Sequence, residues 1–140
     1  MAVYCGSSVG NNHLFFEAAE NIGKFLANNN IKLIYGGGNL GLMGAVSGAA
    51  LKNGGEVMGV ITSHLINKEK INEDLTDIHI VDSMSQRKNK MFNAADAFLI
   101  LPGGIGTLEE FFEILSWKQL KIHSKDILIY NVNNYWDDLN

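Results

Sequence analysis

The feature that most constrains the fold is a recurring junction, in which a short apolar run leads directly into a turn of small residues. The apolar runs occupy residues 2–5, 31–35 and 97–101, and the turns that follow them occupy residues 6–8, 36–38 and 102–106. Apolar residues at helical spacing come after each turn. Strands that alternate with helices favour a parallel sheet covered on both faces. The sequence therefore predicts an α/β fold, a Rossmann-like three-layer sandwich with a mostly parallel central sheet.

The rest of the chain extends this pattern within one expected domain. Further strands are expected at 57–61, 78–81 and 127–130, and a polar helix is expected at 84–95. Residues 63–77 carry mixed charges without a clean period, so we expect a mobile loop there. Residues 135–139 resemble the first turn of another helix. We therefore expect residues 1–140 to form a single nucleotide-binding domain, either complete or shortened at its C-terminus.

Composition excludes several classes of function. The formal net charge of −4 gives no basic footprint for nucleic acid, and no run approaches the ~20 apolar residues of a membrane span. Cys5 is the only cysteine, so no internal disulfide can form, and a cytoplasmic location is expected. The four histidines show no metal-ligand spacing. We expect a small-molecule substrate, with no metal, no cofactor, no nucleic acid and no membrane partner.

The turn at 102–106 predicts a phosphate site. A glycine turn between a strand and a helix directs backbone N–H groups and the positive helix end at an anion. The donors expected there are Gly103, Gly104, Gly106 and the Thr107 hydroxyl. No Walker lysine follows the last glycine, which disfavours hydrolysis of a nucleoside triphosphate. Binding of a monophosphate is therefore the function expected of this turn.

Two carboxylates follow this turn and admit two interpretations. In the first, Thr107 and Glu110 form a capping box and Glu109 is a surface charge that complements the helix dipole. In the second, one carboxylate acts as a base or cation stabiliser and the other binds a hydroxyl. The helix N-terminus would keep both ionised. The sequence leaves both interpretations open.

Arg87 and Lys88 place two cations at the expected start of a helix, where the macrodipole disfavours positive charge. Arg87 offers a rigid fork for phosphate or carboxylate, whereas Lys88 is interpreted as a solvated charge or a weaker steering group. An exposed polar face is an equally open interpretation of the pair. Met84 is expected to lie near enough to touch a base.

The turn at 36–38 begins a G-x-G-x-x-G pattern that ends at Gly41. NAD binding would also need an acidic residue at the end of the next strand, but Glu56 precedes that strand. An NAD-dependent enzyme is therefore not favoured. Tight turning alone explains three consecutive glycines poorly, so Gly37 and Gly38 are expected at the ligand, together with Ser7 after the first strand.

Four segments together, at 5–8, 36–44, 84–88 and 102–110, resemble the LONELY GUY (LOG) family of cytokinin riboside 5'-monophosphate phosphoribohydrolases, often mislabelled as lysine decarboxylases. The resemblance implies hydrolysis of the N-glycosidic bond of adenosine 5'-monophosphate (AMP), plain or N6-modified, to free base and ribose 5-phosphate. It also implies a homodimer whose active sites share residues. Two departures are Ser85, where the family usually has histidine, and an altered proline-containing stretch at 65–68.

The same resemblance implies roles for individual residues. Arg87 and Glu110 match the catalytic pair, and Lys88 and Glu109 match nucleotide contacts. Glu69 matches a substrate-binding acid in the preceding loop. The phosphate loop would comprise Gly103, Gly104, Gly106 and Thr107. The alternative function is a non-catalytic nucleotide or cofactor carrier, similar to the molybdenum cofactor carrier proteins that share this fold and glycine loop.

Overall fold

A computed structural model of the protein describes residues 1–6, 13–69 and 71–137. The strands are β1 (Ala2–Tyr4), β2 (Leu33–Tyr35), β3 (Val57–Thr62), β4 (Asp77–Val81), β5 (Ala97–Ile100) and β6 (Asp126–Ile129). The helices are α1 (His13–Asn28), α2 (Gly41–Lys52), α3 (Ile66–Glu69), α4 (Met84–Ala94) and α5 (Ile105–Gln119). Short 3₁₀ turns cover Ser63–Leu65 and Val132–Asn134. Among these helices, none has the length and hydropathy needed to cross a membrane.

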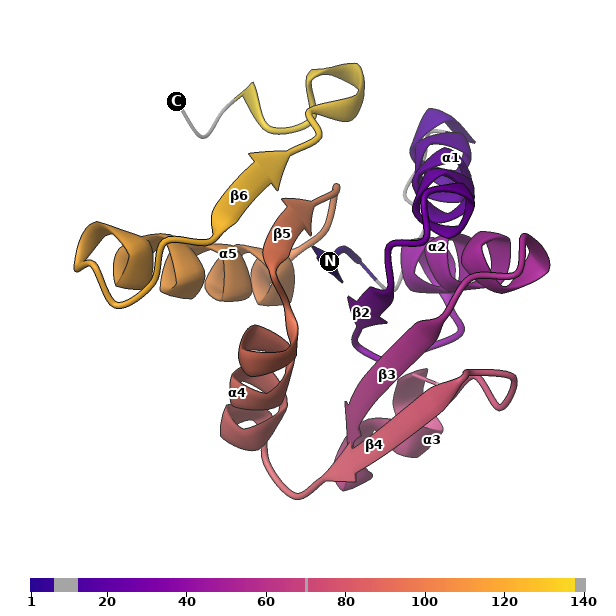
Figure 1. Ribbon diagram of the computed structural model, residues 1–140, viewed down its shortest axis with the longest axis horizontal. Coiled ribbons are helices and arrows are strands. Elements are labelled where there is room, and N and C mark those ends of the chain that lie inside the picture. Colours follow the sequence, from indigo (N-terminus) through magenta and orange to yellow (C-terminus); the bar gives the residue numbers. More distant parts are fainter. Residues whose placement is uncertain (7–12, 70, 138–140) are drawn as a thin grey trace.

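The described strands form one six-stranded sheet in the order β4-β3-β2-β1-β5-β6. Every strand pair is parallel, with Ala2 opposite both Ile34 and Phe98. This arrangement confirms the predicted α/β sandwich (Figure 1). The chain builds outward from β1 to β4 and then crosses to the other side of β1 to form β5. Ligands of open parallel sheets bind at the carboxyl edge where the strand order reverses, which here lies between β1 and β5.

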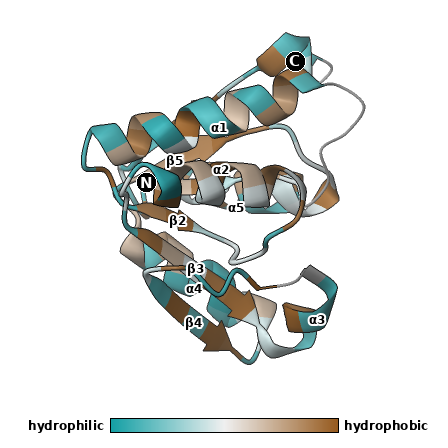
Figure 2. Ribbon diagram, turned by 90° about the vertical axis from the view of Figure 1, so that its right-hand side faces the viewer, coloured by the Kyte–Doolittle hydropathy of each residue, from teal (hydrophilic) through white to brown (hydrophobic). Residues whose placement is uncertain are grey.

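Two apolar layers enclose the sheet. Helices α1 and α2 lie on one side of it and α4 and α5 on the other (Figure 1). Alternate residues of β1 enter different layers, since Val3 packs with the first helix pair and Tyr4 with the second. Figure 2 shows brown and teal bands on α1, as expected for a helix with one face toward the sheet.

The segment expected to be a mobile loop contains regular structure. It includes the 3₁₀ turn and α3, and Ile71 then forms an isolated bridge with Gly38. The Asn72 backbone N–H donates to the Gly37 carbonyl at 3.2 Å, and its side chain is 6% exposed. The prediction failed because these elements are too short for a periodicity and are held by contacts distant in sequence.

Candidate functional site

A cavity of about 230 Å³ opens at the carboxyl edge of the sheet beside β1. Eight of the residues expected at the site line it, namely Met84, Arg87, Lys88, Gly104, Gly106, Thr107, Glu109 and Glu110. The remaining lining residues are Cys5, Gly6, Met43 and Leu65. The Gly6 N–H donates to the Pro102 carbonyl at 3.1 Å, which joins the turns after β1 and β5. The cavity therefore occupies the reversal of strand order.

Arg87 is a buried wall of this cavity and is 4% exposed, so the exposed-face interpretation is wrong for it. Its Nε donates to the Val60 carbonyl at 2.9 Å and its Nη2 donates to the Gly36 carbonyl at 2.7 Å. Its Nη1 lies 3.9 Å from the Met84 sulfur. A Cβ on Gly36 would collide with the guanidinium. The guanidinium of Arg87 therefore fits against this turn only because residue 36 is a glycine.

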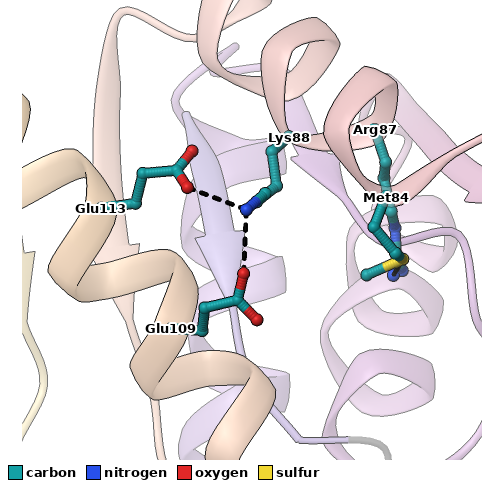
Figure 3. Close-up of polar contacts among 5 residues, drawn as sticks. All are labelled: Met84, Arg87, Lys88, Glu109 and Glu113. Atoms are coloured by element: carbon teal, nitrogen blue, oxygen red, sulfur yellow. Dashed lines mark hydrogen bonds and ion pairs between the residues drawn. The ribbon is translucent and has the colours of Figure 1, made fainter.

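Lys88 points the other way from α4, toward α5 (Figure 3). Its Nζ donates to Glu109 Oε1 and to Glu113 Oε2, each at 2.8 Å. These hydrogen bonds raise the pKa of Lys88. Lys88 is therefore not the solvated charge that one interpretation expected. Sequence reasoning missed Glu113, although its position four residues after Glu109 puts both carboxylates on one helix face.

Glu110 is half-buried, and its charge reaches the end of β1. Burial raises the pKa of the Tyr4 hydroxyl, and the Glu110 carboxylate raises it further. The pKa of the Cys5 thiol is raised by the same two causes in the same order. At neutral pH both groups are therefore uncharged neighbours of Glu110. Of the two carboxylates that line the cavity, Glu110 is the one whose charge acts on both Tyr4 and Cys5.

The start of α5 does not form the capping box of the first interpretation. The helix begins at Ile105 with Gly104 as its N-cap and with no side-chain cap hydrogen bond. Thr107 lies inside the first turn and is 4% exposed. Glu109 and Glu110 lie beyond that turn, where the helix dipole has little effect, so the capping box and the dipole argument for ionisation are both wrong. The first backbone N–H groups of α5 have no intrahelical acceptor and can bind an anion in the cavity.

Some expected site residues lie away from the cavity lining. The Gly37 carbonyl accepts from Asn72, the Gly38 carbonyl accepts from the Tyr35 hydroxyl at 2.8 Å, and the Gly103 carbonyl accepts from the Tyr135 hydroxyl at 2.6 Å. Glu69 ends α3, and its side chain lies outside the described part of the structure, as does all of Ser7. In the described ranges, no three His, Cys, Asp or Glu side chains converge as metal ligands would.

Solved structures with the same fold include carriers of the molybdenum cofactor (Moco). The Moco carrier protein of Chlamydomonas reinhardtii is 20% identical, with a TM-score of 0.75, and the alignment covers 99% of this chain and 82% of that one. The molybdenum cofactor binding protein of Rippkaea orientalis is 21% identical, with a TM-score of 0.72, and covers 91% of this chain and 74% of that one. At this identity the likeness shows the fold alone.

Proteins related by sequence have a higher identity to this chain than these solved structures. A "cytokinin riboside 5'-monophosphate phosphoribohydrolase" of Rhodococcoides fascians is 42% identical over 99% of this chain and 71% of its own length. One of Arabidopsis thaliana is 44% identical over 99% of this chain and 65% of its own length, and a "probable" one of Oryza sativa subsp. japonica is 45% identical over 99% and 56%. The chain thus spans less than two thirds of the length of these two plant relatives.

A family model described as "Possible lysine decarboxylase" matches residues 43–140. That range includes the two helices whose side chains form most of the cavity wall, α4 and α5. Together with the relatives above, the match decides the family: the chain belongs to the "Possible lysine decarboxylase" family, which includes the LOG phosphoribohydrolases.

Proposed function

We propose that this chain is a nucleotide-binding α/β domain that hydrolyses the N-glycosidic bond of AMP, plain or N6-modified, and releases the base and ribose 5-phosphate. The observation that carries the proposal is one cavity lined by Glu110, by the buried Arg87 and by the first turn of α5. A carboxylate and an anion site that share one cavity suit a phosphorylated sugar. The names of the relatives from Rhodococcoides fascians and Arabidopsis thaliana support the same reaction.

Glu110 is the proposed catalytic carboxylate. Breaking the ribosyl C–N bond develops positive charge at C1', which an ionised carboxylate below the sugar stabilises while it activates water. The oxygen of that water forms a new C1'–O bond as the C–N bond breaks. One hydrogen of the water stays on the new sugar hydroxyl, and the other ends on the released base. The side chain of Glu110 is half-buried at the cavity, where its charge acts more strongly than in water.

Arg87 orients the substrate rather than donating a proton, because a guanidinium stays protonated at any working pH. Its hydrogen bonds to Val60 and Gly36 fix the plane of the guanidinium at the cavity wall. The first turn of α5 binds the phosphate through backbone N–H groups. Phosphate binding remote from the reacting bond holds that bond against Glu110, so a nucleoside without phosphate is a poor substrate.

Lys88 and Glu109 are the proposed contacts to the rest of the nucleotide. Glu109 is the more exposed partner of Lys88, so its second oxygen is available to a ribose hydroxyl. Glu113 holds the other side of the ammonium group. In the family pattern Glu69 and Ser7 complete the substrate contacts, and we retain both in the proposal.

A homodimer with shared sites is part of the proposal. On α5, three large apolar side chains are exposed, namely Ile105 (84%), Phe112 (50%) and Leu115 (41%). Apolar side chains at this spacing form one stripe, which a second copy can cover. Multi-angle light scattering tests this, with Phe112→Glu as the variant expected to be monomeric. A wild-type monomer contradicts it.

We propose that the protein acts in the cytoplasm. Cys5 is the only cysteine and is buried, so its raised pKa keeps the thiol protonated and poorly reactive. A protein stabilised without disulfides suits a reducing compartment. Fractionation of the source cells, followed by immunoblotting, tests the location.

The deciding experiment incubates the pure protein with AMP and with N6-isopentenyl-AMP and follows the free base by chromatography. We expect Glu110→Gln to lower kcat by at least about a hundredfold while nucleotide binding survives. Glu17→Gln, an exposed change on α1, serves as the matched control. Tight binding without base release from either nucleotide contradicts hydrolysis and supports the carrier alternative. Activity that persists in Glu110→Gln contradicts the role of Glu110.

A further inference from the structure

Tyr135 contacts the glycine loop from a distant part of the sequence. Its hydroxyl donates a 2.6 Å hydrogen bond to the Gly103 carbonyl. Gly103 precedes the N-cap of α5, and its neighbour Gly104 lines the cavity. The proposed reaction assigns Tyr135 no role. The residue nevertheless contacts the main chain of the loop directly.

The hydrogen bond to Gly103 also fixes the next N–H group. The Gly103 carbonyl and the Gly104 N–H belong to one peptide unit, and in a trans peptide they point in opposite directions. The described chain has no cis peptide bond. Between two glycines the peptide plane rotates at little steric cost, so sequence alone selects no orientation. Tyr135 selects the orientation in which the Gly104 N–H points away from the Tyr135 hydroxyl.

The Tyr135 ring is itself held in place by aromatic contacts. It packs edge-on against Phe15, with the ring centroids 5.3 Å apart, and against Trp136 at 4.6 Å. Trp136 is 7% exposed and belongs to the core on the α4 and α5 side. The Trp136 backbone N–H donates to Asn131 Oδ1 at 2.6 Å. The hydroxyl position is thus set by the core, although the Tyr135 side chain itself is 41% exposed.

We infer that Tyr135 is a positioning residue for phosphate recognition, which turns the Gly104 N–H toward a phosphate monoester in the cavity. The inference rests on the proposed function for the identity of the nucleotide, but it concerns binding and not hydrolysis. In this role Tyr135 makes the cavity bind phosphorylated ligands in preference to unphosphorylated ones, although its hydroxyl does not touch the ligand.

Calorimetry with Tyr135→Phe tests the inference, with AMP and adenosine as the two ligands. We expect the Kd for AMP to rise about fivefold, as loss of one hydrogen bond predicts, and the Kd for adenosine to change less than twofold. Tyr130→Phe is the matched control, because Tyr130 is also an exposed tyrosine near the C-terminal end and does not line the cavity. It is expected to change neither Kd.

A second readout follows the site itself. Titration of the ¹⁵N-labelled protein with inorganic phosphate is expected to shift the Gly104 amide resonance in wild type and to shift it less in Tyr135→Phe. Phe15→Leu keeps the hydroxyl but loosens the ring, so a smaller change in the same direction is expected. This variant replaces Tyr135→Phe if the latter does not fold.

Each outcome separates the inference from the proposed reaction. Equal losses for AMP and adenosine, or an unchanged Kd for AMP, overturn the role of Tyr135. So does a Gly104 amide that responds to phosphate equally in both proteins. A wild type that binds AMP but releases no base contradicts the hydrolase proposal, whereas selective loss of AMP affinity in Tyr135→Phe still supports the inference.

Discussion

The two glycine-rich turns beside β1 are similar in sequence, but only one of them opens on the cavity. The turn after β2 is filled by the protein, because the Arg87 guanidinium packs against Gly36 and Asn72 donates to the Gly37 carbonyl. The turn after β5 is open at Gly104 and Gly106, where a Cβ would meet no atom within 4 Å, although a Cβ on Gly103 would collide with Thr107. A glycine turn after a parallel strand thus provides room, and distant residues decide whether side chains or a ligand occupy it.

Arg87→Met tests the filled turn most severely. The change removes the hydrogen bonds to Val60 and Gly36 from a buried position. We expect the free energy of unfolding to fall by about 3 kcal/mol and hydrolysis to be lost. Urea denaturation monitored by circular dichroism measures the first effect. A loss under about 1 kcal/mol would show that the turn does not depend on Arg87.

Gly36→Ala tests the same turn from the other side. The added methyl group collides with the guanidinium, so we expect the free energy of unfolding to fall by about 1–3 kcal/mol. Thermal denaturation of the two proteins measures the difference.

The matched change in the open turn is Gly106→Ala, which adds a methyl group inside the first turn of α5. Because alanine favours a helix, stability is expected to stay unchanged or to rise by up to about 1 kcal/mol. Affinity for AMP is expected to fall, since the methyl group faces the cavity. Equal destabilisation by the two substitutions would contradict the distinction between the turns.

Cys5, which directly follows the strand β1 between the two turns, supplies a pH test. The folded pKa of this thiol is raised above its ordinary value of 9.0, mainly by burial. Its stabilising contribution is complete below pH 9 and is lost above it, because the unfolded thiol then ionises first. We expect a fall of about 1.4 kcal/mol per pH unit from this group. Urea denaturation at pH 8–10 of wild type and Cys5→Ala measures it, and identical pH slopes contradict it.

Lys88→Met is expected to destabilise the protein only slightly and contrasts with Arg87→Met on the adjacent residue. Lys88 bonds to side chains at the rim and not to buried main chain. Its removal is expected to cost about 0.5–1 kcal/mol at neutral pH, and less at high salt. The raised pKa of Lys88 keeps this contribution intact up to the ordinary lysine range, after which it is lost. A salt-independent loss above about 2 kcal/mol would contradict a rim interaction.

Local patterns in the sequence were enough to predict the sheet and one side of the cavity. The apolar runs correctly located β1, β3 and β5, since a buried parallel strand reads as a continuous apolar segment. The turn after β5 was correctly expected at a cavity because such turns share one sheet edge. Arg87 was predicted to have a functional role because a cation at a helix start is disfavoured by the helix dipole.

Contacts between distant segments were beyond local reasoning. No pattern near Gly36 indicates that a side chain from position 87 fills its space, nor does any indicate that Lys88 lies between Glu109 and Glu113. Thr107 and Glu110 have capping-box spacing, but that one of the two interpretations was wrong because the helix begins at Ile105. Such details depend on how α4 and α5 pack, which only the assembled core determines.

The hydrogen bonds of Arg87 have a consequence for local unfolding. One side chain on α4 holds main-chain oxygens of β3 and of the turn after β2, so these three segments cannot separate without breaking the same bonds. Segments linked in this way open as one cooperative unit. Amide protons in this wall should therefore exchange with solvent only at the rate of global unfolding. The opposite wall, at the exposed first turn of α5, should exchange through small local openings while the fold stays intact.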